Sequence, residues 1–222
     1  VYYLSGSDDQ QLMKLDLSTL ATSPVMQLPE LGCTLYASVD GLCVTAPKAD
    51  GTYETSLYEP ETNSLQPSQL TDGASWQNFG AFETQILPEG GLELRVKGQV
   101  DWRLVTSDAV SAVTALNNRV YFLCTNESGA ILRVYDLNAG LLSSAYMFNA
   151  PVQNVLAAGD NLVFAIDAAG TVTAITPEPM AAEKPWATAA NNAALQVCVN
   201  KLLVYGVTEL NTALLETETG SI

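Results

Sequence analysis

The sequence predicts an all-β protein, a β-propeller of about six four-stranded antiparallel blades, and two observations support this prediction. The first is a short apolar run that recurs along the 222 residues. The successive runs, each expected to form a strand, are 1–4, 42–44, 79–82, 120–123, 162–165 and 202–205. Their anchors are Tyr2, Cys43, Phe82, Tyr121, Val163 and Leu203, which are separated by 41, 39, 39, 42 and 40 residues. The second is a polar pair in front of most of these runs. A period near 40 built from short strands is typical of propellers, in which each repeat supplies one blade.

Each polar pair is expected to form a two-residue hairpin turn, because Asn, Asp and Gly tolerate the positive φ of a type I′ turn. The pairs are Asp40-Gly41, Asn117-Asn118, Asp160-Asn161 and Asn200-Lys201. The strands before them are expected at 33–39, 110–116, 152–158 and 193–199. They are rich in Ala, Ser and Val, which suits the innermost strand of a blade, where neighbouring sheets converge.

An acidic residue recurs at the end of the third strand that is expected in four repeats. These residues are Asp16, Glu59, Asp136 and Glu216. We interpret an acid at one register of several repeats as a turn residue that accepts backbone hydrogen bonds, rather than as a catalytic group. A short fourth strand, such as 141–148, is expected to follow and to complete the meander.

The repeats predict a single propeller domain over residues 1–222, with blades at approximately 1–31, 32–70, 71–108, 109–149, 150–190 and 191–222. The chain starts in a second strand and stops after a third, so we expect further residues of the native ring beyond both ends. Two stretches are weakly patterned. Residues 66–77 contain no clear inner strand, and 177–190 contain three prolines, which cannot donate to a sheet ladder and indicate an outer edge or a loop.

The composition excludes several classes of function. Nine Lys and Arg against 24 Asp and Glu give a net charge of −15, and such a surface repels phosphate backbones, so no nucleic-acid partner is expected. No apolar run approaches the ~18 residues that span a bilayer, so this segment is not expected to insert into a membrane. The chain contains no histidine, which excludes Ser-His-Asp and Cys-His catalytic arrangements.

The sequence also contains no recognisable cofactor or metal motif, and we expect no cofactor. It lacks a glycine-rich phosphate loop and a dinucleotide fingerprint, and its acidic loops do not match a calcium-binding loop. The four cysteines are Cys33, Cys43, Cys124 and Cys198. They form no C-x-x-C pair, so buried free thiols are expected rather than a zinc site or disulfides.

Two segments near the N-terminus, 1–7 and 12–19, read Val-Tyr-Tyr-Leu-Ser-Gly-Ser and Leu-Met-Lys-Leu-Asp-Leu-Ser-Thr. This phrase resembles the blade pattern of bacterial propellers of unknown function that are similar to the low-density-lipoprotein-receptor type and the TolB type. The resemblance implies a secreted or surface-attached propeller that acts as a binding scaffold. The chain departs from that pattern because it lacks a Tyr-Trp-Thr-Asp tetrapeptide, and its segment 164–172 is similar to quinoprotein-like repeats.

The candidate binding residues are Trp76, Trp186, Trp102, Arg95, Lys97 and Arg103. The three basic residues lie within nine positions around Trp102 and form either a docking patch or, as the alternative, a solvated strand face. Trp76 and Trp186 lie in the weakly patterned stretches, where a loop would carry them to an end face as an aromatic platform. Packing between blades is the alternative interpretation of both tryptophans.

We therefore expect a non-enzymatic binding scaffold, extracellular or at the cell surface, that presents an acidic face to another protein or to a cell-envelope polysaccharide. The end-face loops at 66–77 and 177–190 are the expected contact regions. The alternative is a carboxylate-dependent enzyme that processes a glycan or a peptide in the propeller channel; a glycosidase would need two carboxylates about 5 to 9.5 Å apart. A third interpretation is a sub-domain of a larger assembly whose missing strands come from a neighbour.

Overall fold

A computed structural model describes residues 1–6, 9–126, 129–148, 152–158, 162–167, 171–177, 180–182, 186–187, 193–198, 201–206 and 212–216. Every element among these residues is a β-strand, and the strands pair antiparallel. The all-β class is therefore confirmed for the described part of the chain. This part contains no helix that would be able to cross a membrane. The chain divides into two compact units, Val1–Leu104 and Val105–Ile222.

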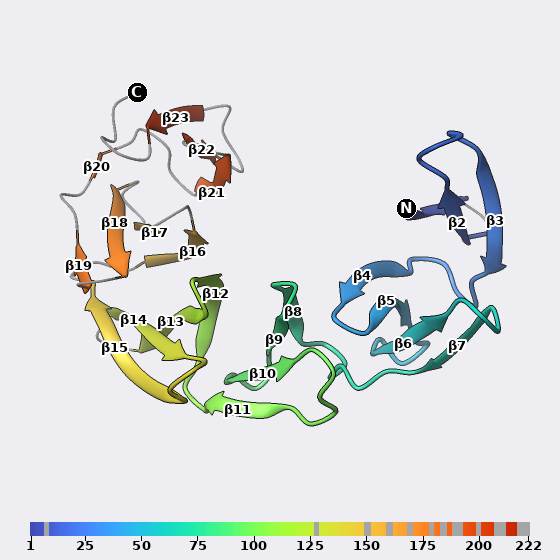
Figure 1. Ribbon diagram of the computed structural model, residues 1–222, viewed down its shortest axis with the longest axis horizontal. Helices are drawn as coiled ribbons and strands as arrows, with labels where there is room; N and C mark the ends of the chain where they lie inside the picture. The colour runs from blue at the N-terminus through green and yellow to red at the C-terminus, as the bar shows by residue number, and fades with distance from the viewer. Residues whose placement is uncertain are drawn as a thin grey trace. The chain divides into compact units, whose positions relative to one another are not determined.

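The described strands of the first unit form three sheets, and strands adjacent in sequence are adjacent in each sheet (Figure 1). The first sheet consists of β1 (Tyr2–Ser5), β2 (Gln11–Leu15) and β3 (Thr22–Gln27). The second consists of β4 (Thr34–Ser38), β5 (Gly41–Pro47), β6 (Tyr53–Glu59) and β7 (Ser64–Pro67). The third consists of β8 (Ser75–Asn78), β9 (Phe82–Ile86), β10 (Leu92–Val96) and β11 (Arg103–Thr106), and β11 lies where the chain passes into the second unit.

The described strands of the second unit also form three sheets. The first consists of β12 (Val110–Leu116), β13 (Arg119–Asn126), β14 (Gly129–Asp136) and β15 (Leu141–Met147). The next consists of β16 (Val152–Ala158), β17 (Val163–Asp167), β18 (Thr171–Pro177) and β19 (Met180–Ala182), with β20 (Trp186–Ala187) also paired to β18. The last consists of β21 (Ala193–Cys198), β22 (Lys201–Gly206) and β23 (Thr212–Glu216). The short strands β19 and β20 confirm an outer edge in the proline-containing stretch.

The predicted inner strands agree closely with the structure, and one of the predicted hairpin turns, Asn117-Asn118, is confirmed. Strands β12 and β16 have the predicted bounds, β4 is one residue shorter than predicted at each end, and β21 is one residue shorter at its C-terminal end. Asn117 and Asn118 have φ values of 51° and 58°, as a type I′ turn requires. The first turn is shifted by one residue, because Gly41 already belongs to β5 and pairs with Ser38. Residues 160, 161 and 200 lie outside the described residues, and Lys201 opens β22.

The third repeat differs from its prediction in two ways. The expectation that residues 66–77 contain no inner strand was wrong, because β8 pairs with β9 from Ser75 onward. The run expected to begin a strand at Phe79 was also misplaced. Phe79 instead donates its backbone N–H to the carbonyl of Phe82 (2.9 Å), and Gly80 has a φ of 83°, so these residues form the turn between β8 and β9. The strand therefore begins only at Phe82.

The acids at the third-strand ends serve the turns that follow them. Asp16 accepts the backbone N–H groups two and three residues further on, at 2.8 and 3.2 Å. Asp136 makes the same pair of hydrogen bonds, at 2.9 and 2.9 Å. Glu59 accepts the N–H two residues further on, at 3.2 Å. The structural interpretation is confirmed for these three, whereas the side chain of Glu216 lies outside the described residues.

The core of each unit lies between neighbouring sheets. In the first unit the sheet β4–β7 lies between β1–β3 and β8–β11 (Figure 1), and strand β4 contacts β8. An apolar cluster joins the first two sheets through Leu12, Leu28, Cys33, Val44 and Tyr58. In the second unit β12 contacts β16, and a second cluster contains Tyr121, Leu123, Leu132, Val134, Val163, Ala165 and Ile175. Each fully buried large side chain of this kind contributes about 1.5–3 kcal/mol.

Candidate functional site

A layer of polar side chains is buried between the sheets β4–β7 and β8–β11 of the first unit. Strands β9 and β10 supply two directly opposed pairs, Glu83 with Arg95 and Gln85 with Glu93. Side chains alternate across a strand, so these four residues belong to one face of the sheet. Glu83 and Gln85 are fully buried, and Arg95 is 4% exposed. Such a face is stable only where each polar group finds a partner.

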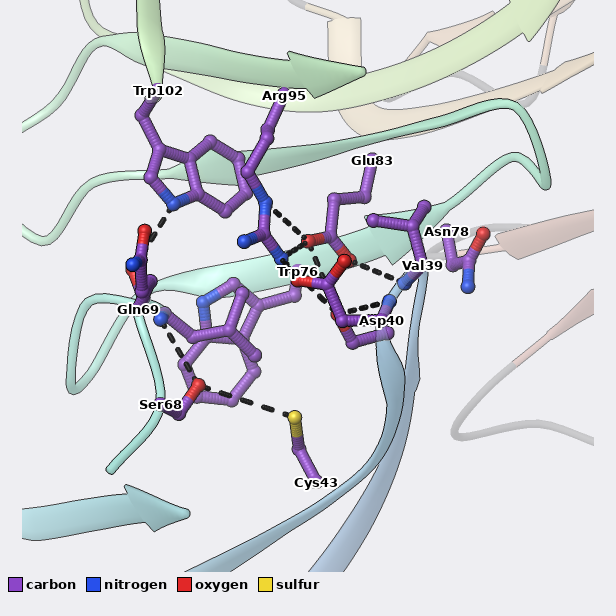
Figure 2. Close-up of polar contacts among 12 residues, drawn as sticks. Val39, Asp40, Cys43, Ser68, Gln69, Trp76, Asn78, Glu83, Arg95 and Trp102 are labelled. Atoms are coloured by element: carbon purple, nitrogen blue, oxygen red, sulfur yellow. Dashed lines mark hydrogen bonds and ion pairs between the residues drawn. The ribbon is translucent and has the colours of Figure 1, made fainter. Parts of the chain in front are cut away.

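The Glu83 carboxylate accepts five hydrogen bonds (Figure 2). Its Oε1 accepts from Nε of Arg95 (3.0 Å), from Nη2 of the same residue and from the Ser38 hydroxyl (3.1 Å). Its Oε2 accepts from the Tyr36 hydroxyl (3.3 Å) and the Val39 N–H (3.1 Å). Burial, and then the charge of Glu83, raise the pKa of Tyr36 above its ordinary value, so the phenol remains a donor. Through these bonds Glu83 connects the sheet β8–β11 to the β4–β5 hairpin of the neighbouring sheet.

Arg95 connects this carboxylate to a second acid and to an indole ring. Its Nη2 also lies 2.7 Å from Oδ2 of Asp40. The Trp102 ring lies over the guanidinium, with 5.1 Å between the guanidinium carbon and the ring centroid, which is a cation–π contact. Trp102 is held in turn by a hydrogen bond from its Nε1 to the carbonyl of Gln69 (3.0 Å). Nη1 of Arg95 has no partner among the described residues, and Figure 2 places it on the side of Gln69, away from Glu83.

The structure separates the basic residues that the sequence places around Trp102. Arg95 is buried in ion pairs, so neither an exposed docking patch nor a solvated strand face describes it. Lys97 is exposed in the turn after β10, and Arg103 is exposed in β11. The structure thus brings Arg95 and Trp102 together, and a binding role for Lys97 and Arg103 stays a prediction.

The two other candidate tryptophans have different outcomes. Trp76 was expected on a loop, but it is a half-buried residue of β8. Its Nε1 donates to Oε1 of Gln85 (3.3 Å), and its ring centroid lies 5.6 Å from that of Tyr36. These contacts agree with the alternative interpretation of Trp76, packing between neighbouring sheets. Trp186 pairs with Val172 through the backbone, and its side chain lies outside the described residues.

An open cavity of about 340 Å³ adjoins the buried ion cluster. One side of the cavity is formed by residues of the sheet β4–β7, of its first turn and of the position directly after β7: Asp40, Leu57, Pro67 and Ser68. The other side is formed by Arg95, Gln99 and Val100. The cavity lies within the first unit. Its volume falls in the lower part of the range of ~300–1,000 Å³ that is usual for small-molecule sites.

Sequence reasoning missed Glu83 and Gln85 and treated Asp40 only as a turn residue. A signal for the first two was present, because they alternate with Phe82, Thr84 and Ile86 in a repeat whose counterparts are mostly apolar. This period-2 pattern of polar residues was hidden because the strand was placed three residues too early. No local signal linked Asp40 to Arg95, which lies 55 positions further along the chain.

The thiols near these sheets are not suited to nucleophilic chemistry. Cys33, Cys43 and Cys124 are free and buried, which confirms the prediction for these three, whereas the side chain of Cys198 lies outside the described residues. Burial raises the pKa of each of the three, that of Cys124 to about 11, so they stay protonated at neutral pH. The described residues contain no group of three His, Cys, Asp or Glu side chains that could hold a metal ion.

Comparison with known proteins supports the fold. No protein-family model matches the chain, and no curated protein matches it. Among solved structures, the computationally designed protein Ika8 is 16% identical, with a TM-score of 0.67 over 99% of this chain and 69% of that one. A nidogen–laminin complex gives 11% identity and 0.59 over 99% and 90%, and a putative TolB from Agrobacterium tumefaciens gives 11% and 0.53 over 94% and 85%. These propeller-like neighbours share the fold, and their low identity carries no function across.

Proposed function

We propose that the protein is a non-enzymatic binding scaffold built as a β-propeller of about six blades, and that it binds another protein or a cell-envelope polysaccharide. The antiparallel meanders, the contacts between inner strands within each unit and the propeller-like neighbours support the architecture. The observation that carries the binding function is the cavity beside Arg95. It presents a rigidly held charged group that keeps one nitrogen available.

The arrangement of acids at this cavity favours binding over carboxylate-dependent catalysis. Asp40 and Glu83 share the guanidinium of Arg95, but only Asp40 lines the cavity. Glu83 already accepts five hydrogen bonds, three of them from strand β4 and the turn after it and two from the side chain of Arg95. A reaction that used both carboxylates would have to break the contacts that hold the two sheets together.

The net charge narrows the class of partner. With a charge of −15, the chain repels acidic polymers and attracts basic surfaces. The proposed partners are therefore a neutral polysaccharide or a protein with a basic face. The proposal includes the extracellular or cell-surface location that the sequence resemblance implies.

The proposal is tested by sedimentation of the purified protein with insoluble neutral polysaccharides and with peptidoglycan. We expect the protein to enter the pellet with at least one polymer, while the number of reducing ends and free amino groups in that polymer stays constant. New reducing ends or amines that increase with protein concentration would support the enzymatic alternative. A protein that remains in the supernatant with every polymer contradicts polysaccharide binding.

A further inference from the structure

We propose that the cavity between the sheets β4–β7 and β8–β11 binds a single neutral sugar unit through Arg95 and Asp40. This inference rests on the proposed binding function and specifies its ligand. It depends on three features of the described residues: a fixed donor, an adjacent acceptor, and apolar walls beside an ion cluster of low net charge.

The donor is Nη1 of Arg95. The guanidinium is 4% exposed and is held by Glu83, Asp40 and the overlying ring of Trp102. A side chain held on several sides loses little further conformational freedom when a ligand arrives. Nη1 has no partner among the described residues, and it lies on the side of Gln69, which lines the cavity together with Arg95 (Figure 2).

The acceptor is the carboxylate of Asp40. Its Oδ2 is engaged by Arg95 at 2.7 Å, and its side chain is 36% exposed where it lines the cavity. The hairpin that carries it is fixed, because the preceding Val39 donates its N–H to Glu83 (3.1 Å). Arg95 and Asp40 thus bring a donor nitrogen and an acceptor carboxylate to the same cavity, which suits hydroxyl groups, since each hydroxyl both donates and accepts.

The charge of the site favours a neutral ligand. One guanidinium and two carboxylates, Asp40 and Glu83, leave a net charge of −1, which disfavours an anionic ligand. A ligand carboxylate would meet the charge of Asp40, and a ligand ammonium would meet the edge of Arg95, so either ion is repelled by one half of the pair. Leu57, Pro67 and Val100 line the same cavity and offer apolar surface to the C–H faces of a sugar ring. A volume of about 340 Å³ suits one unit rather than a longer segment.

The test is a titration followed by amide NMR on the full chain. The probes are glucose, galactose and N-acetylglucosamine, with acetate, methylammonium and a blocked glycine peptide as alternatives. We expect saturable shifts of the amides of Ser68, Gln69 and Gln99 with at least one sugar, at a dissociation constant on the order of 1 mM, which is typical of a few hydrogen bonds.

Two variants with matched controls tie the shifts to the cavity. Val100→Trp fills the cavity mouth and is expected to abolish the shifts, whereas Leu104→Trp, at another exposed apolar position outside the cavity lining, is expected to retain them. Asp40→Asn is expected to weaken binding at least tenfold. Asp50→Asn, which changes an exposed turn acid of the same sheet, is expected to leave the affinity unchanged.

The outcomes separate this inference from the proposed function. If no sugar shifts these amides, while sedimentation with a polysaccharide is unchanged in Val100→Trp, the cavity assignment is overturned and the scaffold stands. If the blocked peptide or an ion shifts them and the sugars do not, the ligand class is wrong. If neither shifts nor sedimentation occur, this inference fails together with the polysaccharide-binding form of the proposed function.

Discussion

Two layers between neighbouring sheets, one in each unit, occupy the same place in the repeat with opposite chemistry. Between β12–β15 and β16–β19 the layer is apolar, whereas between β4–β7 and β8–β11 it contains a buried ion cluster. The registers match: Glu83 pairs with Asn78, the last residue of its inner strand, as Val163 pairs with Ala158. Across the next pairing, Glu83 faces Arg95 and Val163 faces Ile175.

This match teaches that the fold does not require polar residues at these positions. A buried ion pair stabilises a protein no better than well-packed apolar residues of similar volume, because desolvation opposes the Coulomb attraction. The apolar layer of the second unit therefore contributes to stability and to nothing else that the structure shows. The polar layer provides a fixed guanidinium at the edge of a cavity, which is a reason to keep it in a repeat that folds without it.

The largest expected effect tests the polar layer. Glu83→Ala leaves Arg95 buried with one fewer partner and orphans the donors that reached the carboxylate, so we expect a loss of about 3–5 kcal/mol in the free energy of unfolding. The double change Glu83→Val with Arg95→Ile copies the second unit and is expected to recover a large part of that loss. Urea unfolding measures the stability of the single and the double variant. If Glu83→Ala lost no more stability than the exposed control Glu61→Ala, the buried ion cluster would not hold the two sheets together as described.

A change in the apolar layer is expected to have a somewhat smaller effect. Leu132 is fully buried in the cluster of the second unit, and Leu132→Ala is expected to cost about 2–5 kcal/mol through lost burial and the cavity left behind. This cost should not vary with salt concentration, because no charge is involved. A cost that changes strongly between low and high salt would show that the two layers are not the distinct types described above.

An intermediate effect is expected at the ring above Arg95. Trp102→Leu removes the cation–π contact and the hydrogen bond to Gln69, so we expect a loss of about 1–2 kcal/mol. Trp76→Phe, which removes one hydrogen bond to Gln85, serves as the matched change within the same sheet. Thermal unfolding compares them, and equal losses would argue that the contact with Arg95 adds nothing.

The smallest effect concerns the exposed turn acids, which the two units share. Hydrogen bonds from Ser18 lower the pKa of Asp16. The pKa of Asp136 is lowered most by the hydrogen bond from the Ala139 N–H and next by the hydrogen bond from the Arg119 side chain. Because the folded pKa lies below the unfolded one, their stabilisation is present above the unfolded pKa and is lost as pH falls through the folded pKa. NMR titration of the carboxyl carbons should give midpoints below 3.8 for both. Ser18→Ala should raise the midpoint of Asp16 alone.

The sequence predicts the regular repeats well and the third repeat poorly, for a physical reason. Strands such as Val110–Leu116 show apolar and small residues together with a turn pair of two asparagines, so local preferences and the fold agree. In the third repeat the inner strand contains Trp76 and the second strand contains Glu83. A large aromatic residue and a charged residue at these positions are more typical of a loop or of an exposed strand face, so the pattern does not predict buried strands. Their burial depends on Ser38 and Val39 in another repeat, and such distant partners leave no local trace.

The hydrogen bond from Val39 to Glu83 has a consequence for how this protein can be re-engineered. Propeller repeats are attractive modules because one copy can in principle replace another, yet here the acceptor sits on one copy and its donors on the copy before it. Exchanging either copy alone would leave the buried carboxylate of Glu83, or the donors that hydrogen-bond to it, without a partner. The second and third repeats therefore form one inseparable module, and any shuffled or consensus version of this chain must move them as a pair.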